Sequence, residues 1–62
     1  MSKNTILAFL LNQLQSACSA GNKDVATKAL DRFEEAVYRF GVKDGERAVG
    51  AAHSDFAAFF PA

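Results

Sequence analysis

The chain has 62 residues, of which half are apolar, and its seven basic and seven acidic side chains give no formal net charge. A chain this short forms one domain and buries only about 60% of the surface that its unfolded form exposes. Its one cysteine, Cys18, excludes an internal disulfide, and one cysteine with one histidine falls short of the four ligands usual in a structural zinc site. Homo-oligomerisation or tight helix packing must therefore stabilise the fold.

The distribution of charge and hydropathy argues against two further classes of protein. Neither end of the chain forms a charged tail, whereas proteins that bind nucleic acids usually gather basic residues on one face. The apolar run Ile6–Leu11 is too short for a membrane span, and polar residues interrupt it where a signal peptide would continue. We therefore expect a cytoplasmic protein without a membrane partner, and we regard nucleic acid as an unfavourable partner.

Residues 4–20 are predicted to form the first helix. Ser2 or Asn4 is a suitable N-cap, because either side chain can accept a hydrogen bond from a free N–H group of the first turn. Apolar residues recur at helical spacing and define a core-facing stripe of Ile6, Leu7, Leu10, Leu11, Leu14, Ala17 and Cys18. Phe9 falls nearly opposite this stripe, among polar residues. It is either a lone exposed aromatic side chain or an anchor for a contact with a partner.

The second helix is predicted over residues 23–40. Gly21 suits the left-handed residue that follows a helix end, Asn22 suits an N-cap, and Gly41 marks the end of this helix. The core-facing stripe consists of Val25, Ala26, Ala29, Leu30, Phe33, Ala36, Val37 and Phe40. Tyr38 lies off the stripe and is a second aromatic candidate for a contact. The short connection to the first helix implies that these two helices are antiparallel neighbours.

The third helix is predicted over residues 45–59, with Asp44 as its N-cap and Pro61 as the residue that stops it. Its face of larger residues consists of Ala48, Val49, Ala52, His53, Phe56, Phe59 and Phe60. The other side is a surface of small residues, namely Gly50, Ala51, Ser54, Ala57 and Ala58. Glycine costs about 1 kcal/mol relative to alanine inside a helix, so Gly50 suggests that another backbone approaches this surface closely.

Few side chains in this sequence offer chemistry. Cys18 lies on a leucine-rich stripe, which is typical of a small buried hydrophobe rather than of a reactive nucleophile. His53 lies at the edge of its stripe, where we expect a hydrogen bond to a carbonyl or to water; a role as a pH sensor or ligand is the alternative. Glu34 and Glu35 are adjacent on a helix and do not face each other. We therefore expect no catalytic residue, no metal site, no cofactor and no enzymatic activity.

The pattern as a whole predicts an all-α fold: a single helical domain over residues 1–62, built as a small three-helix up-down-up bundle and completed by homodimerisation. The leading functional hypothesis is a small non-enzymatic interaction module or regulator that binds a protein partner. Its size fits the regulators that phages and other mobile elements encode. The residues predicted to contact a partner are Phe9, Tyr38, Gly50, Ala51, Ser54, Ala57, Ala58, Phe59 and Phe60. The alternatives are a nucleic-acid-binding regulator that uses Arg32, Arg39 and Arg47, and a structural subunit of a larger assembly.

Overall fold

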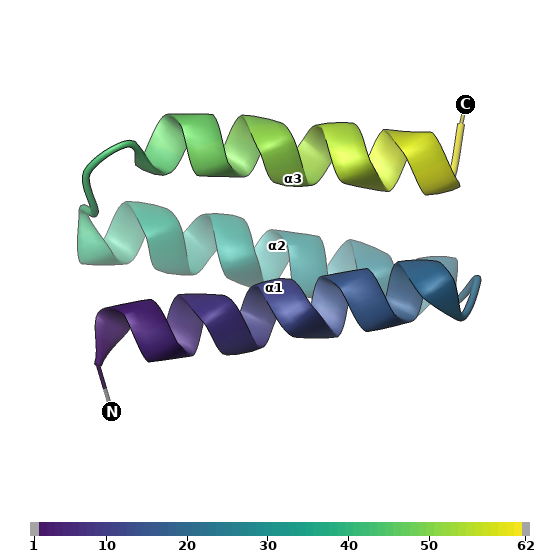
Figure 1. Cartoon of the computed structure of the whole chain (residues 1–62), viewed down its shortest axis with the longest axis horizontal. Coiled ribbons are helices and arrows are strands. Elements are labelled where there is room, and N and C mark those ends of the chain that lie inside the picture. The colour runs from purple at the N-terminus through teal and green to yellow at the C-terminus, as the bar shows by residue number, and fades with distance from the viewer. Residues whose placement is uncertain (1, 62) are drawn as a thin grey trace.

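The computed structural model describes residues 2–61 and contains three helices, α1 (Lys3–Ser19), α2 (Lys23–Phe40) and α3 (Gly45–Phe59). Consecutive helices run in opposite directions, so that α1 begins and α3 ends at opposite ends of the molecule (Figure 1). The described part of the chain contains no strand. The prediction of an all-α three-helix bundle is therefore confirmed, and the second and third helices have the bounds that the sequence predicts.

The turn between α1 and α2 satisfies the backbone groups at both helix ends. Gly21 has a φ of +70°, and its N–H donates to the carbonyl of Cys18 at 3.0 Å. The N–H of Asn22 donates to the carbonyl of Ala17 at 2.9 Å, which completes a Schellman motif. The side chain of Asn22 then accepts from the N–H of Val25 at 3.2 Å and caps α2. This turn is built as the sequence predicts.

The start of α1 is capped by Ser2, whose Oγ accepts from the N–H of Thr5 at 3.2 Å. The side chain of Lys3, in the first turn of α1, reaches the C-terminal end of α2. Its Nζ donates to the carbonyl oxygen of Phe40 at 3.4 Å and lies 6.0 Å from the centroid of the Phe40 ring. A cation at this position also complements the negative end of the α2 dipole. These contacts join the start of α1 to the end of α2.

The connection between α2 and α3 differs from the prediction in one respect. Gly41 has a φ of +62° and ends α2 as expected. Asp44 does occupy the N-cap position of α3, but its side chain makes no capping hydrogen bond, so the prediction of a side-chain cap is wrong. The reason is local geometry: Asp44 has a left-handed backbone with a φ of +61°, whereas a capping side chain normally sits on an extended residue.

The core is centred on α2. Its buried side chains pack against both other helices, and α1 and α3 contact each other least. The buried residues are Leu14, Ala17, Cys18, Ala26, Ala29, Leu30, Phe33, Val37, Val49 and Ala52. The molecule measures 29 × 21 × 13 Å along its principal axes and is therefore closer to a slab than to a sphere.

Four residues that the sequence places on core-facing stripes are exposed, namely Val25, Ala48, His53 and Phe59. Each lies toward the edge of its stripe. Because α1 and α3 both lie against α2 but hardly contact each other, the edges of the stripes stay uncovered. The sequence predicts the width of an apolar stripe, whereas the arrangement of the neighbouring helices decides how much of it is buried.

Gly45, the first residue of α3, is buried where α3 begins against α2. A Cβ atom added at this position would lie 2.5 Å from Cγ1 of Val37 and 3.4 Å from Cγ2 of Val42. Val37 is itself buried and β-branched, so it has little freedom to move away. The absence of a side chain at Gly45 therefore sets the distance between the start of α3 and the end of α2.

This contact predicts opposite effects for the same substitution at two glycines of α3. Gly45→Ala should lower the free energy of unfolding by about 1–3 kcal/mol, because the added methyl group overpacks the contact with Val37. Gly50→Ala should raise it by about 0.5–1 kcal/mol, because no atom lies within 4 Å of the added Cβ and alanine favours the helix. Urea unfolding followed by far-UV circular dichroism measures both changes. A Gly45→Ala variant as stable as the unsubstituted chain would contradict the packing described above.

Candidate functional site

Large apolar side chains are exposed at three places on the described surface. Phe9 on α1 and Val25 on α2 are 58% and 47% exposed and line the same groove. Tyr38, which is 59% exposed, lies beside the loop between α2 and α3. Phe59, which is 54% exposed, lies at the end of α3. The predicted exposure of Phe9 and Tyr38 is thus observed, and Val25 joins them.

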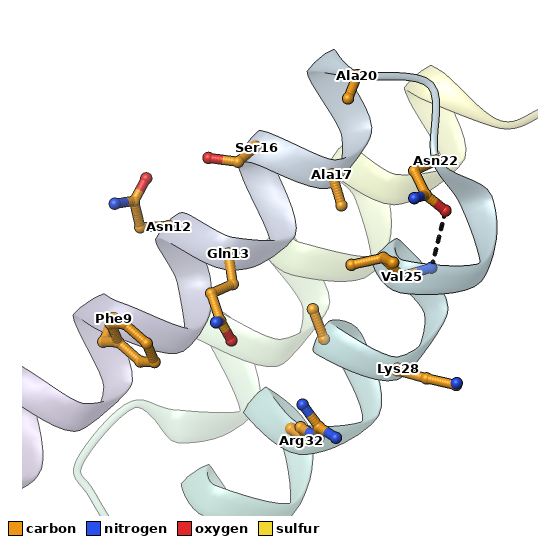
Figure 2. A pocket seen from close by; sticks show the side chains of 11 residues that line it. Phe9, Asn12, Gln13, Ser16, Ala17, Ala20, Asn22, Val25, Lys28 and Arg32 are labelled. Atoms are coloured by element: carbon orange, nitrogen blue, oxygen red, sulfur yellow. Dashed lines mark hydrogen bonds between the residues drawn. The ribbon is translucent and has the colours of Figure 1, made fainter.

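The groove that contains Phe9 runs between α1 and α2 and has a volume of about 400 Å³. On α1 and its C-cap residue it is lined by Phe9, Asn12, Gln13, Ser16, Ala17 and Ala20. On α2 and the preceding turn it is lined by Asn22, Val25, Lys28, Ala29 and Arg32. The groove forms because the side chains that face each other across the two helices, such as Ala17 and Ala29, are small. In Figure 2, where the groove faces the viewer, α3 lies behind α1 and α2.

The lining of this α1/α2 groove combines apolar and amide groups. Val25 extends from α2 toward α1, and Gln13 extends from α1 toward α2, so both side chains reach into the space between the helices (Figure 2). Phe9 lies at the end of the groove far from the turn, and Asn22 lies at the turn itself (Figure 2). A bound group would therefore meet the ring of Phe9 at one end and the amide of Asn22 at the other, with the apolar Val25 and the amide of Gln13 between them.

The charged side chains that line the α1/α2 groove are Lys28 and Arg32, and both are basic. Within residues 2–61 neither of them has a carboxylate within 4.0 Å. The facing helix α1 contains no acidic residue. The charged groups that line the groove are therefore both cationic and form no ion pair within residues 2–61, while Asp24 and Glu35 lie within one turn of them on α2, outside the lining.

A second, smaller groove of about 250 Å³ continues on the same flank of α2 and shares Arg32 with the first. Arg39 lines it together with Glu35. Arg47, by contrast, lines a groove of about 500 Å³ beside the α2–α3 loop, along with Asp44 and Glu46. The structure thus places Arg32 and Arg39 on one flank of α2 and sets Arg47 among acidic side chains elsewhere.

The small-residue surface of α3, predicted from the sequence, is open to solvent. Gly50, Ala51, Ser54, Ala57 and Ala58 are all exposed. The backbone that was expected to approach Gly50 is not supplied by the described chain, because nothing lies within 4 Å of a Cβ built there. Any such approach would have to come from another molecule.

The two phenylalanines at the end of α3 have different environments. Phe60 is half-buried, packs against the core, and lies 5.2 Å from Phe56 between ring centroids at an angle of 50°. Phe59 points away from the core and is exposed. As a candidate for contact with a partner, Phe59 therefore offers much more surface than Phe60.

His53 joins α3 to α2 through a side-chain hydrogen bond to Glu34. Its Nε2 lies 2.9 Å from Oε1 of Glu34. The expectation of a carbonyl or water partner is therefore wrong: antiparallel packing brings the edge of α3 beside the polar flank of α2, where the nearest acceptor is a carboxylate. Both side chains are substantially exposed, so solvent screens this pair.

Cys18 is buried against the core, as its place on the leucine stripe predicts. Burial raises the pKa of the Cys18 thiol above its usual value, and the negative charge of Asp55 raises it further. Both effects keep the sulfur protonated near neutral pH, and burial restricts access of a reagent. In the described chain no group of three or more histidine, cysteine or acidic side chains is arranged to hold a metal ion. Nor does it contain a helix of the length and hydropathy needed to cross a membrane.

The α1/α2 groove is the feature that the sequence reasoning missed. A signal for it does exist: Phe9, Gln13 and Ser16 follow helical spacing on α1, and Val25 and Arg32 do so on α2. Taken alone, the first set belongs to a polar face, and the second joins Val25, which the sequence places on the core-facing stripe, to a charged residue. Only the packing of the two helices brings these flanks together into one hollow.

Comparison with known proteins gave no relative. No protein-family model, no curated protein and no solved structure matches this chain. The function is therefore inferred from the groove, the exposed side chains and the charges described above.

The burial of Cys18 predicts slow modification of its thiol. At pH 8, alkylation by iodoacetamide should be roughly a hundredfold slower in the folded chain than in urea, because opening this core costs a few kcal/mol in a domain of this size. Mass spectrometry of samples quenched at successive times measures both rates. Equal rates would mean that Cys18 is accessible in the folded protein.

The raised pKa of Cys18 also predicts the direction of a pH effect. The folded state disfavours the thiolate, so the stability gained from a neutral thiol is fully present below the ordinary thiol pKa of about 8.5. It is lost as the pH rises through the higher pKa of the folded state. Urea unfolding between pH 8 and pH 11 should show a loss that is smaller in a Cys18→Ala variant, and an identical pH dependence would contradict the assignment.

The exposed pair of His53 and Glu34 should add little to stability. A double-mutant cycle with His53→Ala and Glu34→Gln is expected to give a coupling of less than about 1 kcal/mol at pH 6, decreasing with added salt. Urea unfolding of the four proteins measures it. A coupling of several kcal/mol would show that this pair, rather than apolar contact, holds α3 on α2.

Proposed function

We propose that this chain is a non-enzymatic interaction module that binds another protein, and that the α1/α2 groove is its binding surface. The observation that carries the proposal is the gathering of two exposed apolar side chains, Phe9 and Val25, in one groove of about 400 Å³ with Arg32, which forms no ion pair within residues 2–61. Aromatic residues, including phenylalanine, and arginine are enriched at the centres of protein interfaces. Exposed apolar side chains that cluster at a hollow mark such sites.

A non-catalytic role is supported by the state of the reactive side chains. Cys18 is buried with a raised pKa, and the His53 ring is engaged by Glu34. The α1/α2 groove contains neither of these residues and no carboxylate that would act as a general base. We also propose that the protein is cytoplasmic and is a regulator of the kind that phages and mobile elements encode. Both proposals rest on sequence features alone.

Homodimerisation through α3 is a second proposal, supported by the exposure of its small-residue surface. Small side chains let two helices approach closely, and Gly50 lies in the middle of this surface with free space around it. In a dimer of this kind, Gly50→Leu should dissociate the two copies while leaving each copy folded. Sedimentation velocity at micromolar concentration separates a dimer from a monomer, and a monomeric unsubstituted chain would remove this proposal.

Two other functions are less well supported. Binding of nucleic acid would draw on Lys28, Arg32 and Arg39, but Arg47 lies apart among acidic side chains. A subunit of a larger assembly would use Phe59, which is exposed, whereas Phe60 packs on the core. Each of these functions predicts a different contact surface, and this difference makes them separable by experiment.

Site-specific photo-crosslinking in the native host tests the proposed binding surface. A photoreactive phenylalanine analogue replaces Phe9 in the groove, Ala58 on the small-residue surface of α3, or Gln15, which is exposed and lines no groove described here. We expect position 9 to form an adduct with another polypeptide and position 15 to form none. An adduct of the chain with itself from position 58 would support the homodimer.

The remaining outcomes of the crosslinking experiment identify the alternatives. An adduct at position 9 that nuclease digestion removes would favour nucleic-acid binding instead. If position 9 forms no adduct under conditions in which position 58 does, the α1/α2 groove is not the binding surface. Mass spectrometry of the adducts identifies the bound molecule in each case.

A further inference from the structure

We infer that the partner bound in the α1/α2 groove is an amphipathic helix that carries acidic side chains beside its apolar stripe. This inference rests on the proposed function, since it names the class of partner for the same groove. Three observations lead to it: the nature of the groove walls, the sign and spacing of their charges, and the positions of the apolar side chains.

The walls of the groove favour a helix over an extended strand. Both walls are α-helices, whose backbone N–H and C=O groups are already paired within each helix. An extended segment laid between them would find no backbone partners of the kind that the edge of a sheet supplies, and its own polar groups would be left unpaired. A helix satisfies its own backbone and presents only side chains, which is what these walls can receive.

The dimensions of the groove suit a helix of a few turns. Along α1 and its C-cap the lining residues run from Phe9 to Ala20, which at 1.5 Å per residue corresponds to about 16 Å of helix axis. A partner helix of about three to four turns covers this length. Apolar residues spaced i, i+3/i+4 and i+7 on that helix would then face Phe9, Val25 and the small residues between them.

The charges of the groove select an acidic partner. Lys28 and Arg32 are four residues apart, so they lie one turn apart on the same flank of α2. A helix lying alongside would meet both with two carboxylates at the same i, i+4 spacing. Neither cation is engaged by a carboxylate of the described chain, and α1 has no acidic side chain to repel the partner. Lys3, in contrast, is already held by Phe40.

A displayed library of helical peptides tests the inference with the whole chain as bait. The library consists of 15-residue sequences with fixed helix-favouring positions and random residues on one face. We expect selection to enrich peptides with apolar residues at i, i+3/i+4 and i+7 and with Asp or Glu beside them. A proline placed in the middle of a selected peptide should abolish its binding, because it breaks the helix.

Charge-reversal variants test whether the selected peptides bind in the α1/α2 groove. In a Lys28→Glu/Arg32→Glu variant, acidic peptides should bind about tenfold more weakly or worse, because both favourable charge pairs become repulsive. The matched control is Lys23→Glu/Arg47→Glu, which changes the net charge by the same amount at two exposed residues outside this groove. Binding to the control should stay within about twofold of the unsubstituted chain. Circular dichroism verifies that each variant is folded.

Several results would overturn the inference. The selection would contradict it if no peptide is enriched or if basic or proline-containing peptides are enriched. The binding measurements would contradict it if acidic peptides bind both double variants equally. Competition by a 20-nucleotide single-stranded DNA at the same concentration would assign the groove to nucleic acid. A dimer of the unsubstituted chain that the Lys28→Glu/Arg32→Glu variant dissociates would assign it to a second copy.

Negative results of the peptide experiment and of the crosslinking experiment reject different proposals. A protein adduct from position 9 together with a selection that shows no acidic preference would reject the acidic helix and leave the interaction function standing. Absence of that adduct would reject the groove as the site of the proposed function, even if acidic peptides bind it in isolation.

Discussion

The packing of α2 against both neighbours is the interaction on which the rest of the structure depends. Ala26, Phe33 and Val37 are almost completely buried, and they lie on the helix that makes most of the contacts with both others. A chain of this length is too short to form a second core that could hold the fold together. The close approach at Gly45 belongs to the same interaction, because it allows α3 to begin directly against Val37.

This dependence on one central helix also creates the exposed surfaces. Because α1 and α3 both use α2 and contact each other little, the molecule is thin in one direction and most of its residues lie near a face. One flank of the α1/α2 pair remains open as the groove, and the outer side of α3 remains open as the small-residue surface. A small bundle with these two open surfaces gains further apolar burial by association, which is the physical basis of the proposed interaction function.

The charges of α2 divide in a way that its net charge conceals. Lys28, Arg32 and Arg39 line the grooves on the side of α1, whereas Glu34 lies on the other flank, where it pairs with His53 of α3. Three basic side chains of the helix therefore gather on one flank, with Glu35 among them, although the whole chain has no formal net charge. Charge summed along a sequence does not reveal such a division, because residues four apart share a flank and residues two apart do not.

The sequence by itself determined the three helices, the turn at Gly21 and Asn22, and most of the core. These follow from local rules of capping, left-handed residues and helical spacing, which need no knowledge of neighbouring helices. Tertiary structure alone decided the exposure of Val25, the pairing of His53 with Glu34 and the absence of a side-chain cap at Asp44. It also decided the existence of the groove, because a hollow between helices depends on how far apart and at what angle their flanks meet. That geometry is set by packing across the core, where residues distant in the sequence determine each other's surroundings.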